Sequence, residues 1–425
     1  MMRVGLCGLG TVGSGLFNLF SNNGEEINRK TGDAPKLIQV GCRRDHPDCD
    51  LSTTSVTRDI FDVARNPDVD ILVELIGGTD TAKDLVMEAI NNGKHVVTAN
   101  KALIALHGDE VFAAAAEKNV TVRFEAAIAG GIPIVKSIRE GLAGNRIEWV
   151  AGIINGTSNF ILSEMASPGS NRSFEDVLKE AQDLGYAEAD PTFDVEGIDA
   201  AHKLTILASI AFGVPLSFSA IYTEGISAVT SADIRFADEL GYRIRHLGIA
   251  RRRTDGVELR VHPTLVAREQ ILAQVDGVMN AVMVGSDAAG ATMYYGAGAG
   301  DGQTASAVMA DIIDVSRTGT SLSDIGFVDL SETRFVPIEE IRTSYYLRLA
   351  VVDRPGVMAE VTSILSEHEV SIEALIQKDA RPSDAQIVIV TNDILESEIN
   401  DAIRQLQSLD EVTAAISRIR IADFR

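Results

Sequence analysis

The sequence predicts an α/β protein with a doubly wound domain over residues 1–130, an α+β domain over 131–330 and a small βαββαβ domain over 343–425. Three observations predict this fold class. Short apolar segments alternate with amphipathic ones near the N-terminus, and a glycine-rich turn follows the first apolar segment. The last part of the chain carries a complete strand–helix–strand–strand–helix–strand pattern. A chain of 425 residues also exceeds one ordinary domain core.

The N-terminal region contains four apolar segments short enough to be strands buried on both faces. Between the third and the fourth, residues 81–92 place apolar side chains at helical spacing. Continuous apolar strands separated by helices are typical of a parallel sheet with helices on both faces. The predicted strands are Val4–Cys7, Leu37–Cys42, Ile71–Ile76 and His95–Thr98.

A G-x-G-x-x-G motif follows the first predicted strand directly and precedes a helix. In this place the glycines allow a tight turn and a close approach of the backbone to a pyrophosphate, and the helix start offers free N–H donors. The motif alone is weak, but its position favours a Rossmann NAD(P) site over a purely structural turn. The predicted cofactor-binding residues are Gly8, Leu9, Gly10, Thr11, Val12 and Gly13.

The end of the second strand bears on the choice of cofactor. An acidic residue there usually binds the ribose 2′-hydroxyl of NAD, whereas arginine suits the 2′-phosphate of NADPH. Arg43 and Arg44 follow this strand and favour NADPH, although they could also be two solvated side chains. Asp45 leaves NAD open.

An acidic segment between residues 185 and 203 carries five carboxylates and then a lysine. Glu196, Asp199 and Lys203 have the spacing i, i+3 and i+7, which predicts one shared face of a helix over residues 196–212. A lysine beside acids at the start of a buried helix can have a tuned pKa. The simpler alternative is a surface ion pair.

This segment resembles the signature of homoserine dehydrogenases. The match rests on Ala181, Gly185, Asp190, Pro191, Asp194, Gly197, Asp199 and Lys203. The resemblance implies that Lys203 is the catalytic acid/base and that Lys101 positions substrate and nicotinamide. It also implies that Glu188, Asp194 and Asp199 bind substrate, together with Lys101.

Other segments are similar to the same family over residues 1 to 330. They are the loop 98–102, the turn 155–160 and the returning segment 295–308, with Gly300 at the nucleotide. Gly77 and Lys101 join the implied cofactor set. The resemblance further implies a monovalent cation, Na⁺ or K⁺, and backbone carbonyls suit such hard ions. The implied cation residues are Glu125, Ile128, Gly130 and Ile132.

The implied activity is the reversible NAD(P)H-dependent reduction of L-aspartate 4-semialdehyde to L-homoserine, a step in threonine, methionine and isoleucine biosynthesis. An aspartate-semialdehyde dehydrogenase would need a nucleophilic cysteine. Cys7, Cys42 and Cys49 lie on two strands and in a polar loop, so none suits that role. A non-catalytic amino-acid sensor on the same fold is the alternative.

The C-terminal segment 347–377 resembles an ACT domain. A strand leads into Asp353–Gly356 and then a helix, and backbone amides near residues 356–358 could receive a carboxylate. The resemblance implies an amino-acid effector, threonine first, and a homo-oligomer, dimer or tetramer. A generic βαββαβ fold without a ligand is the alternative. Residues 333–343, with Pro337, are predicted to be a linker.

Composition limits the remaining function classes. The formal net charge is −23, from 61 acidic and 38 basic residues, so nucleic acid and anionic membranes are not expected partners. The sequence shows no signal peptide and no apolar stretch long enough for a membrane span. Three scattered cysteines do not form a disulfide framework, which favours a cytoplasmic location.

Overall fold

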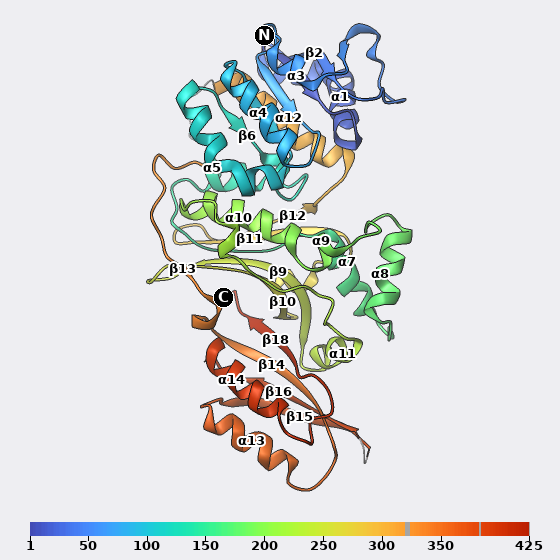
Figure 1. Ribbon diagram of the computed structural model, residues 1–425, viewed down its shortest axis with the longest axis vertical. Helices are drawn as coiled ribbons and strands as arrows, with labels where there is room; N and C mark the ends of the chain where they lie inside the picture. The colour runs from blue at the N-terminus through green and yellow to red at the C-terminus, as the bar shows by residue number, and fades with distance from the viewer. Residues whose placement is uncertain (319–323, 382–383, 425) are drawn as a thin grey trace. The chain divides into compact units, whose positions relative to one another are not determined.

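The computed structural model describes residues 1–318, 324–381 and 384–424, and many of its elements are labelled in Figure 1. The chain forms two compact units. Unit 1 contains residues 1–154, 201–221 and 279–333, and unit 2 contains residues 155–200, 222–278 and 334–425. Unit 1 holds a parallel sheet with helices and unit 2 a mixed sheet, so the predicted α/β class is confirmed.

Unit 1 begins with a six-stranded parallel sheet in the order β3-β2-β1-β4-β5-β6. Its central strands are almost entirely buried, with Val4, Leu6 and Val73 at 0% exposure. The doubly wound prediction is therefore confirmed, and the two short edge strands are additional. The strands are β1 (Arg3–Cys7), β2 (Lys36–Gly41), β3 (Ser55–Thr57), β4 (Ile71–Glu74), β5 (His95–Thr98) and β6 (Val122–Arg123).

Two groups of helices pack with this sheet. One group contains α1 (Thr11–Asn22), α2 (Gly24–Thr31) and α12 (Asp301–Thr318), and the other contains α3 (Ile60–Arg65), α4 (Asp80–Asn91) and α5 (Lys101–Lys118). Helix α12 packs closely on α1. A side chain on Gly15 of α1 would not fit there, because its Cβ atom would lie 2.9 Å from the Asp301 carbonyl oxygen. The chain thus returns to the first helix about 290 residues later.

The rest of unit 1 contains three antiparallel strands: β7 (Ile147–Ile153), β11 (Met279–Ser286) and β12 (Gly290–Ala297). It also contains most of α10 (Ile198–Phe212), whose first residues belong to unit 2. The side chains of α10 are buried nearly all round, which explains its continuous apolar sequence.

Unit 2 contains a mixed sheet in which β9, β10, β18, β14, β16 and β15 follow one another in that order. Only the β10–β18 pair on this path is parallel. Its path strands are β9 (Tyr242–Arg252), β10 (Val257–Ala267), β14 (Arg342–Val351), β15 (Ile372–Arg381), β16 (Asp384–Thr391) and β18 (Ser417–Ala422). Short strands at its margin are β8 (Tyr222–Thr223), β13 (Phe335–Val336) and β17 (Ile394–Leu395). Its helices are α7 (Gly156–Met165), α8 (Phe174–Asp183), α9 (Thr192–Val195), α11 (Ser231–Glu239), α13 (Val357–Glu367) and α14 (Glu396–Gln407).

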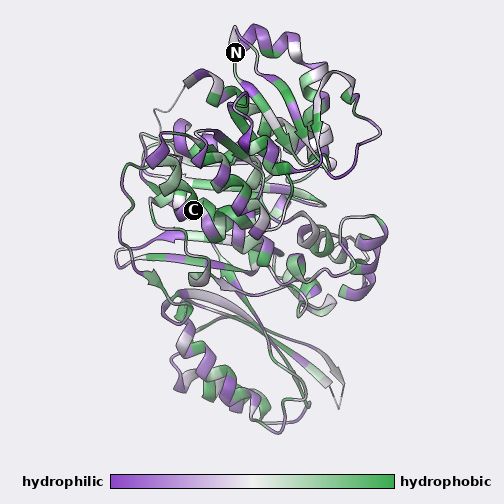
Figure 2. Cartoon of the chain, turned by 45° about the horizontal axis from the view of Figure 1, so that its top comes forward, coloured by the Kyte–Doolittle hydropathy of each residue, from purple (hydrophilic) through white to green (hydrophobic). Residues whose placement is uncertain are grey.

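The C-terminal domain has the predicted βαββαβ order, β14-α13-β15-β16-α14-β18, with the two-residue β17 before α14. Its two helices carry both hydrophobic and hydrophilic residues along their length (Figure 2). Their apolar faces and the sheet form one core around Leu347, Val361, Leu365, Ile389 and Leu406, all of which are fully buried. This part of the fold prediction is confirmed.

The segment 333–343, predicted to be a linker, is packed instead. Strand β13 pairs with β10, and Val336 and Ile341 are only 4% and 1% exposed. Strand β14 already begins at Arg342, and the last strand, β18, pairs directly with β10. The C-terminal domain therefore shares a sheet with the preceding domain, which removes the simple truncation boundary that the linker prediction implied.

Candidate active site

The glycine motif forms the turn between β1 and α1. Gly8 has a left-handed φ of +99°, and a Cβ there would lie 2.5 Å from the Leu75 carbonyl oxygen. A Cβ on Gly13 would collide with the Gly8 carbonyl. Gly10 differs, because it is the N-cap of α1 and a Cβ there would meet nothing within 4 Å. The first and third glycines thus shape the turn, while the second faces space beside the free N–H groups of the helix start.

A cavity of about 690 Å³ opens beside this turn. Gly8, Gly10, Gly77, Arg43 and Arg44 line it, so several of the predicted cofactor positions meet at one place. Asp45 has a different role, since its carboxylate accepts a hydrogen bond of 2.9 Å from Arg58. The cavity therefore offers helix N–H donors and two guanidinium groups, which suit the phosphates of a dinucleotide.

A buried glutamate that was not predicted from the sequence organises the adjacent loops. Glu74, at the end of β4, accepts hydrogen bonds from the backbone N–H groups of Ile76 and Gly77 and from the Thr98 hydroxyl, at 2.9, 3.2 and 2.6 Å. Burial raises the pKa of Glu74, although these hydrogen bonds oppose the shift. The available signal was a charged residue at the carboxyl end of an otherwise apolar strand.

The network continues to the predicted residue Lys101. The Thr98 hydroxyl accepts from the Asn100 backbone N–H at 2.9 Å, and the Asn100 side chain donates to the Gly78 carbonyl and caps α5 through the Leu103 N–H. Lys101 is the first residue of α5 and is half-buried. Gly77 and Lys101 are thus held at the carboxyl ends of two neighbouring parallel strands, where ligands of such sheets bind.

In unit 2 an asparagine joins two of the predicted acids. The Asn155 side-chain amide donates to Asp194 Oδ1 and to Asp199 Oδ2, both at 2.8 Å. The Asn155 side-chain oxygen accepts from the Ser158 N–H, so the same residue also caps α7. Asp199 is only 3% exposed. The carboxylates of the half-buried Asp194 and the buried Asp199 are therefore brought to one point and held in a fixed orientation.

Lys203 lies one turn after Asp199 on α10 and is also buried, at 9% exposure. Its ammonium group donates to the Ile154 carbonyl oxygen at 2.7 Å. Ile154 directly precedes Asn155, so the covalent chain connects the lysine's acceptor to the asparagine that binds the two acids. A buried ammonium group with fixed geometry can stabilise a developing oxyanion and donate a proton to it.

The prediction that Glu196 shares this helix face is wrong. Helix α10 begins at Ile198, and Glu196 lies before it, at the C-cap of α9. Gly197, with φ +82°, separates the two helices, and the Glu196 carboxylate accepts from the Ser227 hydroxyl at 2.8 Å. Only Asp199 and Lys203 of the three residues lie on α10.

Glu188 is exposed in the loop between α8 and α9, and its backbone carbonyl accepts from the Gln182 side chain at 3.1 Å. The structure does not place Glu188 in the Asn155 network.

Gly300, a predicted cofactor residue, has a φ of +138° in the turn before α12, where a side chain would collide with Gln303.

The residues predicted to bind a cation surround a tight turn in unit 1. Ala129 and Gly130 both have left-handed φ values, +50° and +52°. The Glu125 carboxylate accepts hydrogen bonds from the Val135 and Lys136 N–H groups at 2.8 and 2.9 Å. Both of its oxygens are thus already bonded to the backbone of α6 (Ile134–Lys136). Among residues 1–318, 324–381 and 384–424, no three His, Cys, Asp or Glu side chains are placed to hold a metal. Any cation here would depend mainly on backbone carbonyls.

Three family models match the chain. A homoserine dehydrogenase NAD-binding domain matches residues 8–125, a homoserine dehydrogenase domain matches 133–313, and an ACT domain matches 345–411. A homoserine dehydrogenase from Pseudomonas aeruginosa is 58% identical over 99% of this chain and 98% of its own length. One from Neisseria gonorrhoeae is 51% identical over the same shares.

Solved structures give the same result. A homoserine dehydrogenase from Thiobacillus denitrificans has a TM-score of 0.94 and 53% identity, covering 100% of this chain and 99% of the other. A hyperthermophilic archaeal homoserine dehydrogenase in complex with NADPH has a TM-score of 0.63 and 27% identity, covering 78% and 99%. None of the helices in the described ranges could span a membrane. The chain belongs to the homoserine dehydrogenase family of oxidoreductases, in the form that carries an NAD-binding domain and a C-terminal ACT domain.

Proposed function

We propose that this chain reduces L-aspartate 4-semialdehyde to L-homoserine, reversibly, with NADPH as the preferred hydride donor. The observation that carries the proposal is the hydrogen-bonded group of Asn155, Asp194 and Asp199, together with the buried Lys203 on the same helix as Asp199. The comparisons give no support to the alternative of a non-catalytic sensor.

The proposed roles follow from the chemistry of the residues. NADPH, when bound, supplies the hydride that adds to the aldehyde carbon. Negative charge then develops on the carbonyl oxygen, where the Lys203 ammonium group would stabilise it and donate a proton. Asp199 and Asp194 would bind the substrate ammonium group, and Lys101 would position the substrate beside the nicotinamide. Glu188 would join them only after its loop moves inward.

The reverse reaction tests this function directly. Folded protein is mixed with L-homoserine and NADP⁺, and the absorbance of NADPH is followed. We expect NADPH to form, and much less to form with L-serine, which is one methylene shorter. Equal rates with both alcohols would contradict a site built for homoserine.

Gly10 provides a test of the cofactor site that leaves the apo fold intact. We expect Gly10→Ala, and more strongly Gly10→Val, to weaken NADPH binding at least about tenfold, because the added carbon fills the space where the pyrophosphate approaches. Binding is measured by quenching or enhancement of NADPH fluorescence. Gly13→Ala is the contrasting variant, since its Cβ would collide with the Gly8 carbonyl and should also lower the melting temperature. Unchanged NADPH binding in Gly10→Val would contradict the site.

Arg43 and Arg44 should set the preference for NADPH. Both line the cavity, whereas the carboxylate of Asp45 is engaged by Arg58. We expect the double substitution Arg43→Ala and Arg44→Ala to lower kcat/KM for NADPH by about tenfold or more while changing kcat/KM for NADH little. If the ratio of the two values stays at the wild-type level, these arginines do not read the 2′-phosphate.

A monovalent cation, Na⁺ or K⁺, is proposed at the turn near Gly130, with carbonyl oxygens of Ile128, Gly130 and Ile132 as ligands beside Glu125. Left-handed backbone at Ala129 and Gly130 supports a turn of carbonyls there. Activity measured in KCl, NaCl and choline chloride at equal ionic strength tests the proposal. Equal activity in all three would contradict a functional cation.

The regulatory and assembly proposals rest on the C-terminal domain. We divide the chain into an NAD(P)-binding domain (1–130), a substrate domain (131–330) and an ACT domain (343–425), and propose an inhibitory amino-acid effector, threonine first. A homo-oligomer is also proposed, because β15 is the last strand of its sheet and Leu375 on it is 39% exposed. Sedimentation would distinguish a dimer from a tetramer.

The three buried cysteines are thiols, which favours a cytoplasmic location.

A further inference from the structure

The loops that follow β4 and β5 are joined by a closed ring of hydrogen bonds. The Glu74 carboxylate accepts from the Gly77 N–H at 3.2 Å and from the Thr98 hydroxyl at 2.6 Å. The Thr98 oxygen accepts from the Asn100 N–H at 2.9 Å, and the Asn100 side chain donates to the Gly78 carbonyl at 2.6 Å. Gly78 follows Gly77 in the chain, so the ring closes. Neither loop can shift relative to the other without breaking at least one of these bonds.

The centre of this ring is buried. Glu74 and Thr98 are both at 0% exposure. An ionised carboxylate carries only acceptors, and Glu74 uses them for the ring and for a further bond of 2.9 Å from the Ile76 N–H. Hydrogen bonds to a charged group are strong where water does not compete for the donors. The ring therefore imposes one geometry on the two loops.

The loop after β4 depends on the ring for its shape. Gly77 and Gly78 have left-handed φ values of +70° and +73°. A Cβ atom on either residue would meet nothing within 4 Å, so glycine is needed there for its backbone conformation and not for space. Glycine backbone is also the most flexible of all residues when nothing restrains it. The bonds from Glu74 and Asn100 thus hold a segment that would otherwise be free to change conformation.

The ring connects the dinucleotide cavity with Lys101, and all of these residues belong to unit 1. Ile76 and Gly77 line the cavity. At the other end of the ring, Asn100 caps α5 through a bond of 3.1 Å from the Leu103 N–H, and Lys101 is the first residue of that helix. The position of Lys101 is therefore tied to the position of the loop that borders the cofactor cavity.

We propose, on the basis of the proposed dehydrogenase function, that Glu74 and Thr98 are positioning residues for hydride transfer. Through the ring they hold Lys101 and the loop of Gly77 at the separation that places the nicotinamide against the substrate. Hydride transfer requires reacting atoms about 3–3.5 Å apart, and a displacement of about 1 Å can lower the rate about 10²-fold. The phosphates of NADPH are proposed to bind elsewhere, at the glycine turn and the two arginines. The ring should thus affect the reaction much more than the affinity for NADPH.

Thr98 offers a matched pair of substitutions. Thr98→Val keeps the shape of the side chain but removes the hydroxyl that joins Glu74 to Asn100, whereas Thr98→Ser keeps the hydroxyl. We expect Thr98→Val to lower kcat at least about tenfold while the Kd for NADPH stays within about threefold of the wild type. Thr98→Ser should keep kcat within about threefold of the wild type. Asn100→Ser is a second way to open the ring, at its exposed bond to Gly78, and should fold because serine also caps helices.

Thr391→Val is the control for loss of a buried threonine hydroxyl. Thr391 is also at 0% exposure, and its hydroxyl oxygen accepts from the Tyr345 N–H at 3.0 Å, but it lies in unit 2. The folded Thr391→Val variant should keep the wild-type kcat. Fluorescence anisotropy of bound NADPH adds a measurement that needs no turnover, because the nicotinamide is the emitting ring. At saturation the anisotropy should be lower in Thr98→Val and Asn100→Ser than in the wild type, Thr98→Ser and Thr391→Val.

Homoserine deuterated at C4 shows which step is slowed. In Thr98→Val the deuterated substrate should react with NADP⁺ more slowly than ordinary homoserine, because hydride transfer then limits turnover. An equal loss of kcat and of NADPH affinity, or a slowed variant without a deuterium effect, would overturn the proposal. Wild-type kcat and anisotropy in both Thr98→Val and Asn100→Ser would also overturn it. A wild type that binds NADPH but oxidises no homoserine would contradict the proposed function, and the anisotropy comparison would still decide the role of the ring.

Discussion

Replacing Lys203 with alanine is expected to lower kcat by about 10²- to 10⁴-fold with little change in NADPH affinity, because a positioned proton donor contributes that much to catalysis. The side chain is buried on α10 and donates to the Ile154 carbonyl, next to the residue that binds Asp194 and Asp199. Lys203→Arg should also be strongly impaired, since arginine keeps the positive charge but does not release a proton.

Lys94 supplies the control for loss of a buried lysine. It is 3% exposed, and its ammonium group donates to the backbone carbonyls of Asn66 and Val69 at 2.5 and 2.9 Å. Lys94→Met should lower the melting temperature and leave kcat of the folded enzyme near the wild-type value. A folded Lys203→Ala variant with near wild-type kcat would remove Lys203 from the mechanism.

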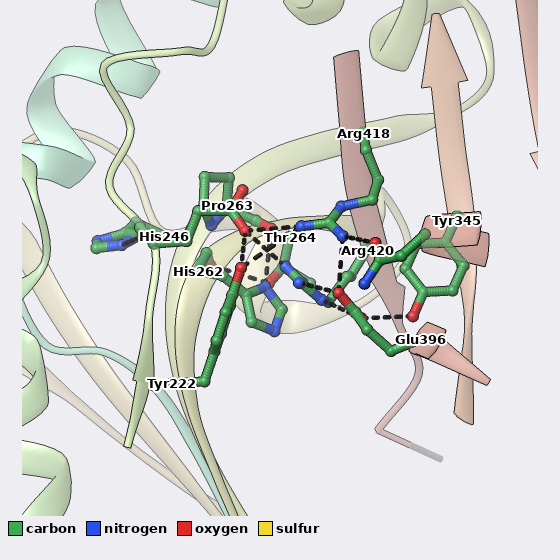
Figure 3. Close-up of polar contacts among 11 residues, drawn as sticks. Tyr222, His246, His262, Pro263, Thr264, Tyr345, Glu396, Arg418 and Arg420 are labelled. Atoms are coloured by element: carbon green, nitrogen blue, oxygen red, sulfur yellow. Dashed lines mark hydrogen bonds and ion pairs between the residues drawn. The ribbon is translucent and has the colours of Figure 1, made fainter. Parts of the chain in front are cut away.

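The second large effect concerns the buried ionic cluster that Glu396 forms with Arg418 and Arg420 in the ACT domain (Figure 3). We expect Glu396→Gln to lower the free energy of unfolding by about 3–5 kcal/mol, because it leaves the buried guanidinium group of Arg420 and the half-buried one of Arg418 without their shared carboxylate. Urea unfolding followed by circular dichroism measures the change. Asp401→Asn is the matched control on the same helix, since Asp401 forms an exposed pair with Arg404. A change no larger than that of the control would contradict the role of the cluster.

The same residue predicts a dependence on pH. Burial alone would raise the pKa of Glu396, but the hydrogen bonds and charge of Arg420, with help from Arg418, outweigh it and lower the pKa below its ordinary value of 4.5. An acid with a lowered pKa stabilises the fold above its unfolded-state pKa and loses this contribution as the pH falls through its folded-state pKa. The wild type should therefore lose stability below about pH 4.5 more steeply than Glu396→Gln.

Local sequence patterns predicted those helices and strands that are determined by residues close together in the sequence. The apolar segment 95–98 became β5 with the same bounds. The helix predicted after Gly356 became α13, which begins at Val357. The glycine motif likewise marked the turn before α1. The two long strands β9 and β10 were not predicted separately, although residues 257–262 of β10 alternate apolar and polar side chains, which is a strand signal.

The active site was predicted less completely. Its partners are far apart in the sequence, and the backbone conformation of one glycine could not be predicted. Spacing placed Glu196 on the helix with Asp199, but the left-handed Gly197 ends one helix before the next begins. The bonds from Asn155 to Asp194 and Asp199 span 39 and 44 residues, so no local pattern contains them. The pairing of Arg420 with Glu224 spans 196 residues and exists only because β18 lies beside β10.

Dehydrogenase activity is measured most directly by following NADPH absorbance when folded, full-length protein receives L-aspartate 4-semialdehyde, with the product identified by mass spectrometry. We expect NADPH to be consumed in equal amount to the L-homoserine formed, and Lys203→Ala to abolish both. If neither NADPH nor NADH is consumed by folded wild-type protein, in the presence of Na⁺ or K⁺, the assignment of dehydrogenase activity to this site is wrong.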